Sequence, residues 1–152
     1  MSVRVYLAGP LFSDAERHFN AGLASILEGE CSVYLPQRDG CLVVDLVENF
    51  QIPWNEAAQE VFDRDQEAIE KCDLLIAVMD GRAVDEGAAF EMGYAFARGK
   101  PCWALKTDPR TLLKYGDNPM LLGALDRIFY NVDDLVEAVR QWQLADHKPQ
   151  GA

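Results

Sequence analysis

Short apolar runs alternate along the chain with longer segments in which apolar residues recur every three to four positions. The apolar runs predict five β-strands, at residues 3–8, 32–35, 74–79, 102–106 and 128–132. The helical periodicity predicts five helices, four of them long, at residues 13–27, 54–71, 87–98 and 133–143, with the short helical pieces between 109 and 126. This alternation is typical of an α/β domain. It indicates a doubly wound, flavodoxin-like sheet of five parallel strands with helices on both faces.

Local signals set the boundaries of these elements. Ser13 followed by Glu16 forms a capping box, which predicts that the first helix begins just after Ser13. Asp133 is expected to cap the last helix. The run at 74–79 is the most apolar, which favours a central strand buried on both faces. Residues 37–53 show no clear periodicity, and we expect a long, lid-like loop there.

The chain is expected to form one domain over residues 1–145, with a polar tail at 146–152. In doubly wound sheets, ligands bind beyond the carboxyl ends of the strands, where the strand order reverses. That rule points to the ends of the first and third strands, at residues 6–11 and 80–91. Functional residues are therefore expected in these two segments.

The composition is strongly acidic, with 25 Asp and Glu against 14 Lys and Arg and a net charge of −11. This balance argues against a nucleic acid polymer as partner, and it disfavours docking on an anionic membrane. The longest apolar run, at 74–79, is too short to cross a bilayer. The four cysteines lack metal-ligand spacing, which indicates reduced thiols in a cytoplasmic protein. Most of the acids are expected on a solvated surface, so the informative ones are those placed elsewhere.

Asp65 is one such acid, because it lies on the apolar stripe of the helix predicted at 54–71. It is three or four residues from Val61, Phe62 and Ile69. A carboxylate on a buried stripe must be paired, protonated or functional, since burying it alone is costly. A structural salt bridge, or a stripe centred slightly elsewhere, would also account for it.

A second group of acids surrounds the start of the helix predicted at 87–98. Its small first residues, beginning with Gly87, would let a ligand approach the backbone. Glu91 lies one turn into the helix, and the positive end of the helix dipole is expected to favour its ionised form. Asp85 lies at the N-cap position. The alternative is that these acids only stabilise the helix; together with Asp65, however, they could form a cluster suited to acid–base and covalent chemistry.

Three parts of the sequence together resemble the nucleoside 2-deoxyribosyltransferase family. They are the opening YLAGPLFS at 6–13, Asp65, and the pattern D-x-G-x-A-x-E-x-G-Y-A at 85–95. The resemblance extends to about residue 120. It implies a flavodoxin-like fold and the exchange of 2-deoxyribose between nucleobases, without a cofactor or a metal ion. The implied partners are small nucleosides and nucleobases.

The resemblance also implies roles for four residues. Glu91 matches the nucleophile that attacks the anomeric carbon, and Tyr6 matches the tyrosine that orients it. Asp65 and Asp85 match the acids that handle base protonation and contacts to sugar or base, and the division between them stays open. The reaction would be a retaining double displacement through a glycosyl-enzyme intermediate.

Five further residues are expected at the substrate. Gly9 and Gly87 belong to the two matching motifs, and Gln37 loosely matches a base-contacting glutamine. Asn118 and Met120 match an N-x-M element that a neighbouring subunit contributes to the sugar 5′ end, so a homo-oligomer is expected. The 37–53 loop, with the side chains of its Phe50 and of the adjacent Trp54 as possible walls, is the candidate gate that keeps water out.

Other functions remain open on the sequence. The main alternative is a hydrolase that cleaves the N-glycosidic bond of nucleoside 5′-monophosphates, with Arg17, Arg82 and the N–H groups at the first helix start as phosphate donors. A non-catalytic nucleotide-binding regulator is a lesser alternative. The sequence contains no GxGxxG, GxxxxGK[ST] or GxSxG motif. A carboxylate-bound Mg²⁺ stays possible on residue type alone.

Overall fold

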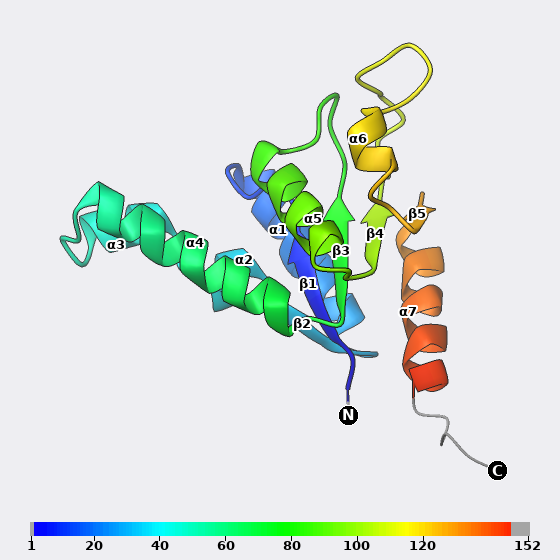
Figure 1. Cartoon of the computed structure of the whole chain (residues 1–152), viewed down its shortest axis with the longest axis horizontal. Helices are drawn as coiled ribbons and strands as arrows, with labels where there is room; N and C mark the ends of the chain where they lie inside the picture. Colours follow the sequence, from blue (N-terminus) through cyan, green and yellow to red (C-terminus); the bar gives the residue numbers. More distant parts are fainter. Residues whose placement is uncertain (1, 147–152) are drawn as a thin grey trace.

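A single sheet of five parallel strands forms the centre of the protein, for which a computed structural model describes residues 2–146 (Figure 1). The strand order is β2-β1-β3-β4-β5. The strands are β1 (Arg4–Ala8), β2 (Ser32–Tyr34), β3 (Leu74–Val78), β4 (Cys102–Leu105) and β5 (Arg127–Phe129). Every residue of the central strand β3 is buried. The predicted flavodoxin-like fold is confirmed, and its order reverses between β1 and β3.

Helices cover both faces of this sheet, because side chains along each strand point alternately to one face and the other. Helices α1 (Asp14–Leu27) and α7 (Val132–Asp146) pack on the face that carries Val5 and Leu7 of β1. Helices α4 (Trp54–Lys71) and α5 (Glu86–Ala97) cover the opposite face. The alternation therefore turns Tyr6, which lies between Val5 and Leu7, toward α4 and α5.

The prediction of one long loop at 37–53 is wrong, since this segment contains two short helices. Helix α2 (Pro36–Asp39) begins with a proline, which suits a first helical turn, and the Asp39 carboxylate accepts the Leu35 N–H at 2.8 Å. Helix α3 (Val43–Glu48) follows. Neither helix is long enough to produce a visible periodicity in the sequence.

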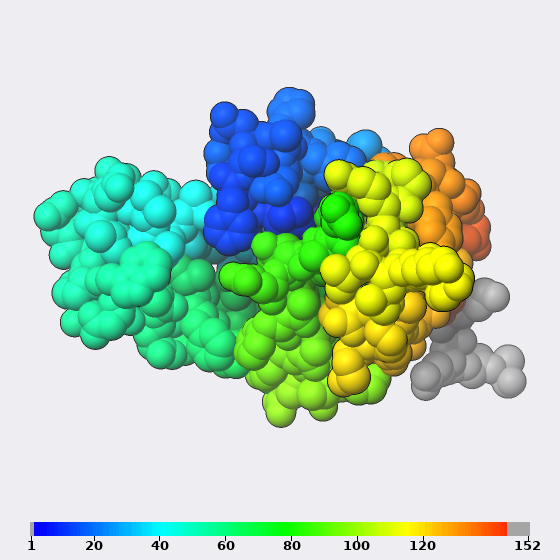
Figure 2. Space-filling view, turned by 90° about the horizontal axis from the view of Figure 1, so that it is seen from above, coloured from blue at the N-terminus to red at the C-terminus, as the bar shows by residue number. Residues whose placement is uncertain are grey.

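Helix α3 packs on α4, and the two form a lobe that projects beside the sheet (Figures 1 and 2). Figure 2 looks onto the carboxyl ends of the strands and shows a hollow where this lobe meets the segment after β1 and the start of α5. No helix among the described residues is both long and apolar enough to cross a membrane. Of the polar tail predicted at 146–152, only the backbone of Asp146, the end of α7, is described.

The bounds of β5 and the cap of α7 also differ from the prediction. Strand β5 ends at Phe129, earlier than predicted, and the short helix α6 (Pro119–Leu122) precedes it. Asn131, and not Asp133, caps α7, because its side-chain oxygen accepts the N–H of Asp134 at 2.8 Å. Asp133 instead lies in the first turn of α7.

The capping box at the start of α1 is confirmed and can be tested. Ser13 Oγ accepts the Glu16 N–H at 3.2 Å, and Glu16 Oε2 accepts the Ser13 N–H at 2.7 Å. Ser13→Ala removes one of these bonds and should lower the free energy of unfolding by about 1 kcal/mol in urea titrations. Ser25→Ala, at an exposed position in the same helix, is the control and should change stability by less than about 0.5 kcal/mol. Equal losses in the two variants would contradict the assignment.

Candidate active site

Helix α5 begins at the carboxyl end of the sheet and brings two acids to it. Asp85 caps the helix, because its Oδ2 accepts the Ala88 N–H at 2.9 Å. The predicted N-cap role of Asp85 is thus confirmed. Gly87, two residues later, has no side chain, and a Cβ there would lie 3.1 Å from Asp85 Oδ2. Glu91, one turn further on, points from α5 toward β1.

Tyr6 holds the carboxyl group of Glu91. The tyrosine lies in the middle of β1 with an exposed fraction of 0%, and its hydroxyl donates to Glu91 Oε1 at 2.6 Å. Burial raises the pKa of Glu91 to about 8, and the negative charges of Asp65 and Asp85 act in the same direction. The hydrogen bond from Tyr6 opposes this shift. The helix dipole was expected to favour the ionised form of Glu91, but burial shifts the balance toward the protonated form.

Asp65 reaches the same region from α4. Its Oδ1 accepts a hydrogen bond from the Tyr34 hydroxyl at 3.2 Å. Burial raises the pKa of Asp65 to about 6, and the bond from Tyr34 opposes the rise. The rings of Tyr34 and Tyr6 stack with their centroids 5.4 Å apart. The two acids are thus held by two adjacent tyrosines.

A cavity of about 590 Å³ lies over these groups, at the hollow seen in Figure 2. It is formed by the segment after β1, the α2–α3 region, α4 and the start of α5. The lining residues are Gly9, Leu11, Phe12, Arg17, Pro36, Cys41, Leu42, Val43, Val44, Asp45, Val61, Asp65, Asp85, Gly87, Ala88 and Glu91. The cavity therefore brings together three acids and two glycines that the sequence singled out, at the predicted end of the sheet. No three His, Cys, Asp or Glu side chains among residues 2–146 form a group that could hold a metal ion.

Three predicted substrate contacts do not line this cavity. Gln37 ties α2 to α1, since its amide donates to the Arg17 carbonyl at 2.8 Å and its oxygen accepts from Asn20 at 3.2 Å. Asn118 caps α6 by accepting the Met120 N–H at 2.9 Å, and the Met120 side chain is 81% exposed. Asn118 and Met120 therefore lie outside the cavity lining of their own chain.

The two aromatic residues predicted to form walls of the cavity do not line it. Phe50 and Trp54 are 69% and 64% exposed and lie outside the cavity lining. The apolar wall comes instead from Leu42, Val43 and Val44, at the start of α3. The 37–53 segment thus contributes to the cavity, but through a helix that the sequence pattern did not reveal.

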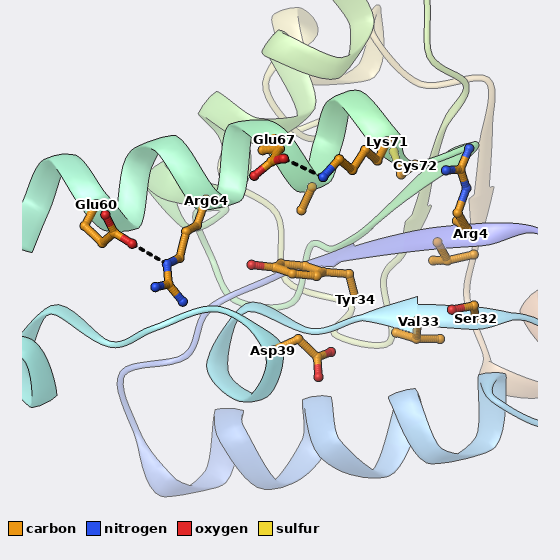
Figure 3. Close-up of a pocket in the computed structure, with 12 residues that line it drawn as sticks. Arg4, Ser32, Val33, Tyr34, Asp39, Glu60, Arg64, Glu67, Lys71 and Cys72 are labelled. Carbon is orange, nitrogen blue, oxygen red and sulfur yellow. Dashed lines mark hydrogen bonds and ion pairs between the residues drawn. The ribbon is translucent and has the colours of Figure 1, made fainter.

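Tyr34 is the contact that the sequence reasoning missed, and a weak signal for it exists. The tripeptide Val-Tyr-Leu occurs twice, at 5–7 and at 33–35. On its other side Tyr34 faces a groove of about 670 Å³ between β2 and α4 (Figure 3). The charged side chains of α4 in that groove pair with one another, Arg64 with Glu60 and Lys71 with Glu67.

Comparison with known proteins assigns the family. The sequence model of the nucleoside 2-deoxyribosyltransferases matches residues 5–147. The chain belongs to the nucleoside 2-deoxyribosyltransferase family. Membership confirms the resemblance found in the sequence, and it makes this chain one of a group of enzymes that act on N-glycosidic bonds.

Individual relatives of the family differ in their described activity. A Thermofilum pendens protein, provisionally named a 2′-deoxynucleoside 5′-phosphate N-hydrolase, is 35% identical over 104 residues, which are 68% of this chain and 67% of the relative. A conserved protein of Enterococcus faecalis V583 has a similar structure, with a TM-score of 0.77, 28% identity, and coverage of 93% of this chain and 99% of the other. A 2-deoxyribosyltransferase of Bacillus psychrosaccharolyticus gives a TM-score of 0.73 and 21% identity, covering 88% and 90% of the two chains. The last similarity shows the fold alone.

The raised pKa of Glu91 predicts a pH-dependent loss of stability. The unfolded chain releases this proton near the usual pKa of 4.5, whereas the folded chain keeps it up to about pH 8. Between these values the folded state binds more protons, so the contribution of Glu91 to stability falls as pH rises. Glu91→Gln removes this penalty and should exceed the wild type in unfolding free energy by on the order of 3 to 5 kcal/mol at pH 8.5.

Urea unfolding of both proteins between pH 5 and pH 8.5 measures this difference, which should shrink toward pH 5. Glu86→Gln, at an exposed position in the first turn of α5, is the matched control. Its stability should follow the wild type at every pH. Parallel curves for wild type and Glu91→Gln would show that Glu91 titrates normally.

Proposed function

We propose that this protein transfers 2-deoxyribose from a nucleoside to another nucleobase through a covalent intermediate on Glu91. The observation that carries the proposal is the 2.6 Å hydrogen bond from Tyr6 to Glu91 in a cavity that Asp65 and Asp85 also line. Glu91 takes its hydrogen bond from a neutral tyrosine and not from a cation. No ion pair among the described residues therefore neutralises this group, and it can react at the sugar as soon as its proton has left.

In the first half-reaction, Glu91 attacks C1′ of the bound nucleoside. The C1′–N bond to the base breaks while a bond from C1′ to a carboxylate oxygen of Glu91 forms, through a state with positive charge on the sugar. That charge favours the ionised form of Glu91, which burial disfavours in the empty cavity. The Tyr6 hydroxyl fixes the direction of the attacking carboxylate and stabilises its charge.

The leaving base needs a proton, and the two aspartates are the candidates to give it. Three carboxyl groups close together do not all ionise readily, so the cluster retains a proton near neutral pH. In the empty cavity Glu91 holds this proton, and it passes to an aspartate as positive charge develops on the sugar. Asp65, with its pKa raised to about 6, or Asp85 passes a proton to the departing base nitrogen.

In the second half-reaction, an incoming base attacks C1′ and breaks the bond to Glu91. Its proton returns to the aspartate, and two displacements give net retention at C1′. Transfer requires that the second base, and not water, reaches the intermediate. The apolar wall from Leu42, Val43 and Val44 supports this requirement, because it offers flat apolar contacts to a base and few to water.

A neighbouring subunit would complete the site in this proposal. Asn118 and Met120 lie on α6, outside the cavity of their own chain, and Met120 presents an exposed apolar side chain. This placement fits a contribution to the 5′ end of the sugar in another copy of the chain. The proposal therefore includes a homo-oligomer.

Hydrolysis of 5′-monophosphates is the second candidate, favoured by the name of the Thermofilum pendens relative. Arg17 is the basic residue among the described residues that line the cavity, but its guanidinium already donates to the Leu11 and Phe12 carbonyls and to Asp14. The Glu16 carboxylate holds the N–H groups of Phe12 and Ser13. These contacts leave a phosphate with few free donors.

The start of helix α5 is also poorly suited to bind a phosphate. Helix N-termini bind phosphates through free N–H groups, yet here the Asp85 carboxylate occupies that position. A dianionic phosphate beside Asp85, Asp65 and Glu91 would meet like charges. The cavity is therefore better suited to an uncharged nucleoside.

A product assay separates the two candidates. Deoxyinosine incubated with adenine should give deoxyadenosine and hypoxanthine, which chromatography resolves. A parallel reaction uses deoxyinosine 5′-monophosphate. Formation of free deoxyribose without deoxyadenosine, or reaction of the monophosphate alone, would overturn the transferase proposal.

The nucleophile is tested separately. Glu91→Ala should lower turnover at least about 10³-fold while the circular dichroism spectrum stays native. With a nucleoside donor and no acceptor, mass spectrometry should find a deoxyribosyl adduct on the wild-type peptide that contains Glu91. Glu86→Ala, on the solvent side of the same helix, should keep full activity. A folded and active Glu91→Ala protein would refute the role, and so would an adduct on another residue.

A further inference from the structure

Two tyrosines lie side by side on neighbouring strands beneath the cavity. The tripeptide Val-Tyr-Leu at 5–7 lies in β1, and its repeat at 33–35 spans the end of β2. The parallel register pairs Tyr6 directly with Tyr34. Their rings stack with an angle of 17° between the planes. Paired positions of adjacent strands face the same side of a sheet, so both hydroxyls are directed toward α4 and α5.

Each hydroxyl binds a different acid. Tyr6 donates to Glu91 at 2.6 Å, and Tyr34 donates to Asp65 Oδ1 at 3.2 Å. We propose that Tyr34 is a positioning residue that orients Asp65 for proton exchange with the nucleobase, as Tyr6 orients Glu91 for attack on the sugar. The inference rests on the proposed function and adds a second tyrosine–carboxylate pair to it.

The backbone at Gly40, just after α2, packs closely against the hydrogen bond between Tyr34 and Asp65. A Cβ atom on Gly40 would lie 3.0 Å from Tyr34 Oη and 3.2 Å from Asp65 Oδ1, and 2.7 Å from the Pro36 carbonyl oxygen. Only a residue without a side chain lets the end of α2 approach so closely. Gly40 has a negative φ of −87°, so close approach and not backbone conformation is what requires glycine here.

A purely structural role would not require the hydroxyl. Tyr34 is half-buried: one side of its ring packs on Tyr6, and the residue also lines the groove between β2 and α4 (Figure 3). A phenylalanine would fill the same space and stack in the same way. What the hydroxyl adds is its bond to Asp65 Oδ1, which leaves the second carboxyl oxygen able to face the cavity.

The hydrogen bond also acts on the acidity of Asp65. Burial raises the pKa of Asp65 to about 6, and the bond from Tyr34 holds it down. The other titratable groups that interact with Asp65 are Tyr6 of β1, Cys41 between α2 and α3, and Glu91 of α5. A pKa near neutrality suits a group that gives a proton in one half-reaction and takes it back in the next.

Tyr34→Phe tests the proposal because it removes the hydroxyl and keeps the ring. The kcat of deoxyribosyl transfer should fall about tenfold, with the KM for the nucleoside unchanged within about twofold. ¹³C NMR titration of labelled aspartate carboxyls should show a higher pKa for Asp65, with Asp65→Asn used to assign the signal. In the Asp65→Asn background, Tyr34→Phe should have no further effect on kcat.

Gly40→Ala is the second variant, because its Cβ would crowd the Tyr34 hydroxyl and Asp65 Oδ1, besides a backbone carbonyl of α2, and the change replaces neither partner of the hydrogen bond. It should move kcat and the pKa of Asp65 in the same directions as Tyr34→Phe. Tyr94→Phe is the matched control: Tyr94 also donates to a carboxylate, Glu70 Oε1 at 2.6 Å, between α5 and α4 but outside the cavity lining. It should change neither quantity.

A folded Tyr34→Phe protein with wild-type kcat, or with an unchanged Asp65 pKa, would overturn the proposal. A full additional loss in the Asp65→Asn background would do the same, since Tyr34 would then act through another group. The NMR titration needs no catalytic activity. Failure of the transferase proposal would appear in the product assay, and failure of the Tyr34 proposal would appear in the titration.

Discussion

The partial burial of the Glu91 carboxyl is the constraint on which the rest of this protein depends. Burial raises the pKa of Glu91 to about 8, so the folded chain carries an acid in an unfavourable setting. Each unit of such a shift corresponds to about 1.4 kcal/mol. The sheet offsets this cost with a strand, β3, that is buried along its whole length. A stable core is thus the condition for keeping a reactive carboxyl beside it.

The sequence was sufficient for the parts of the fold and the site that local patterns encode. Helix α4 has the bounds that its periodicity predicted, and Asp65 and Glu91 were recognisable as acids among apolar neighbours. Tyr34 was not recognised, because the repeated Val-Tyr-Leu is only a weak signal and a tyrosine in a strand resembles any core residue. Its contact with Asp65 depends on the register of two strands and on the direction of a distant helix. The residues around Tyr34 indicate neither the strand register nor the direction of that helix.

The raised pKa of Glu91 is a second property that could not be predicted from the sequence. The helix dipole contributes about 0.3 to 1 kcal/mol near a helix start, and its sign is evident from position alone. Desolvation is larger and depends on what covers the side chain, which only the folded structure reveals. The same holds for the walls of the cavity. Val43 and Val44 form a wall because α3 packs on α4, and a six-residue helix leaves little trace in the sequence.

The pairing of Tyr6 with Tyr34 has a consequence for how this chain can vary. The segment between α1 and β2 can change in length only if β2 keeps its place beside β1. A shift by one position would turn Tyr34 to the other face of the sheet and place Val33 or Leu35 beside Asp65. A shift by two would restore the face but separate the two rings. The alignment of two short strands is therefore as strictly constrained as the identity of the acids themselves.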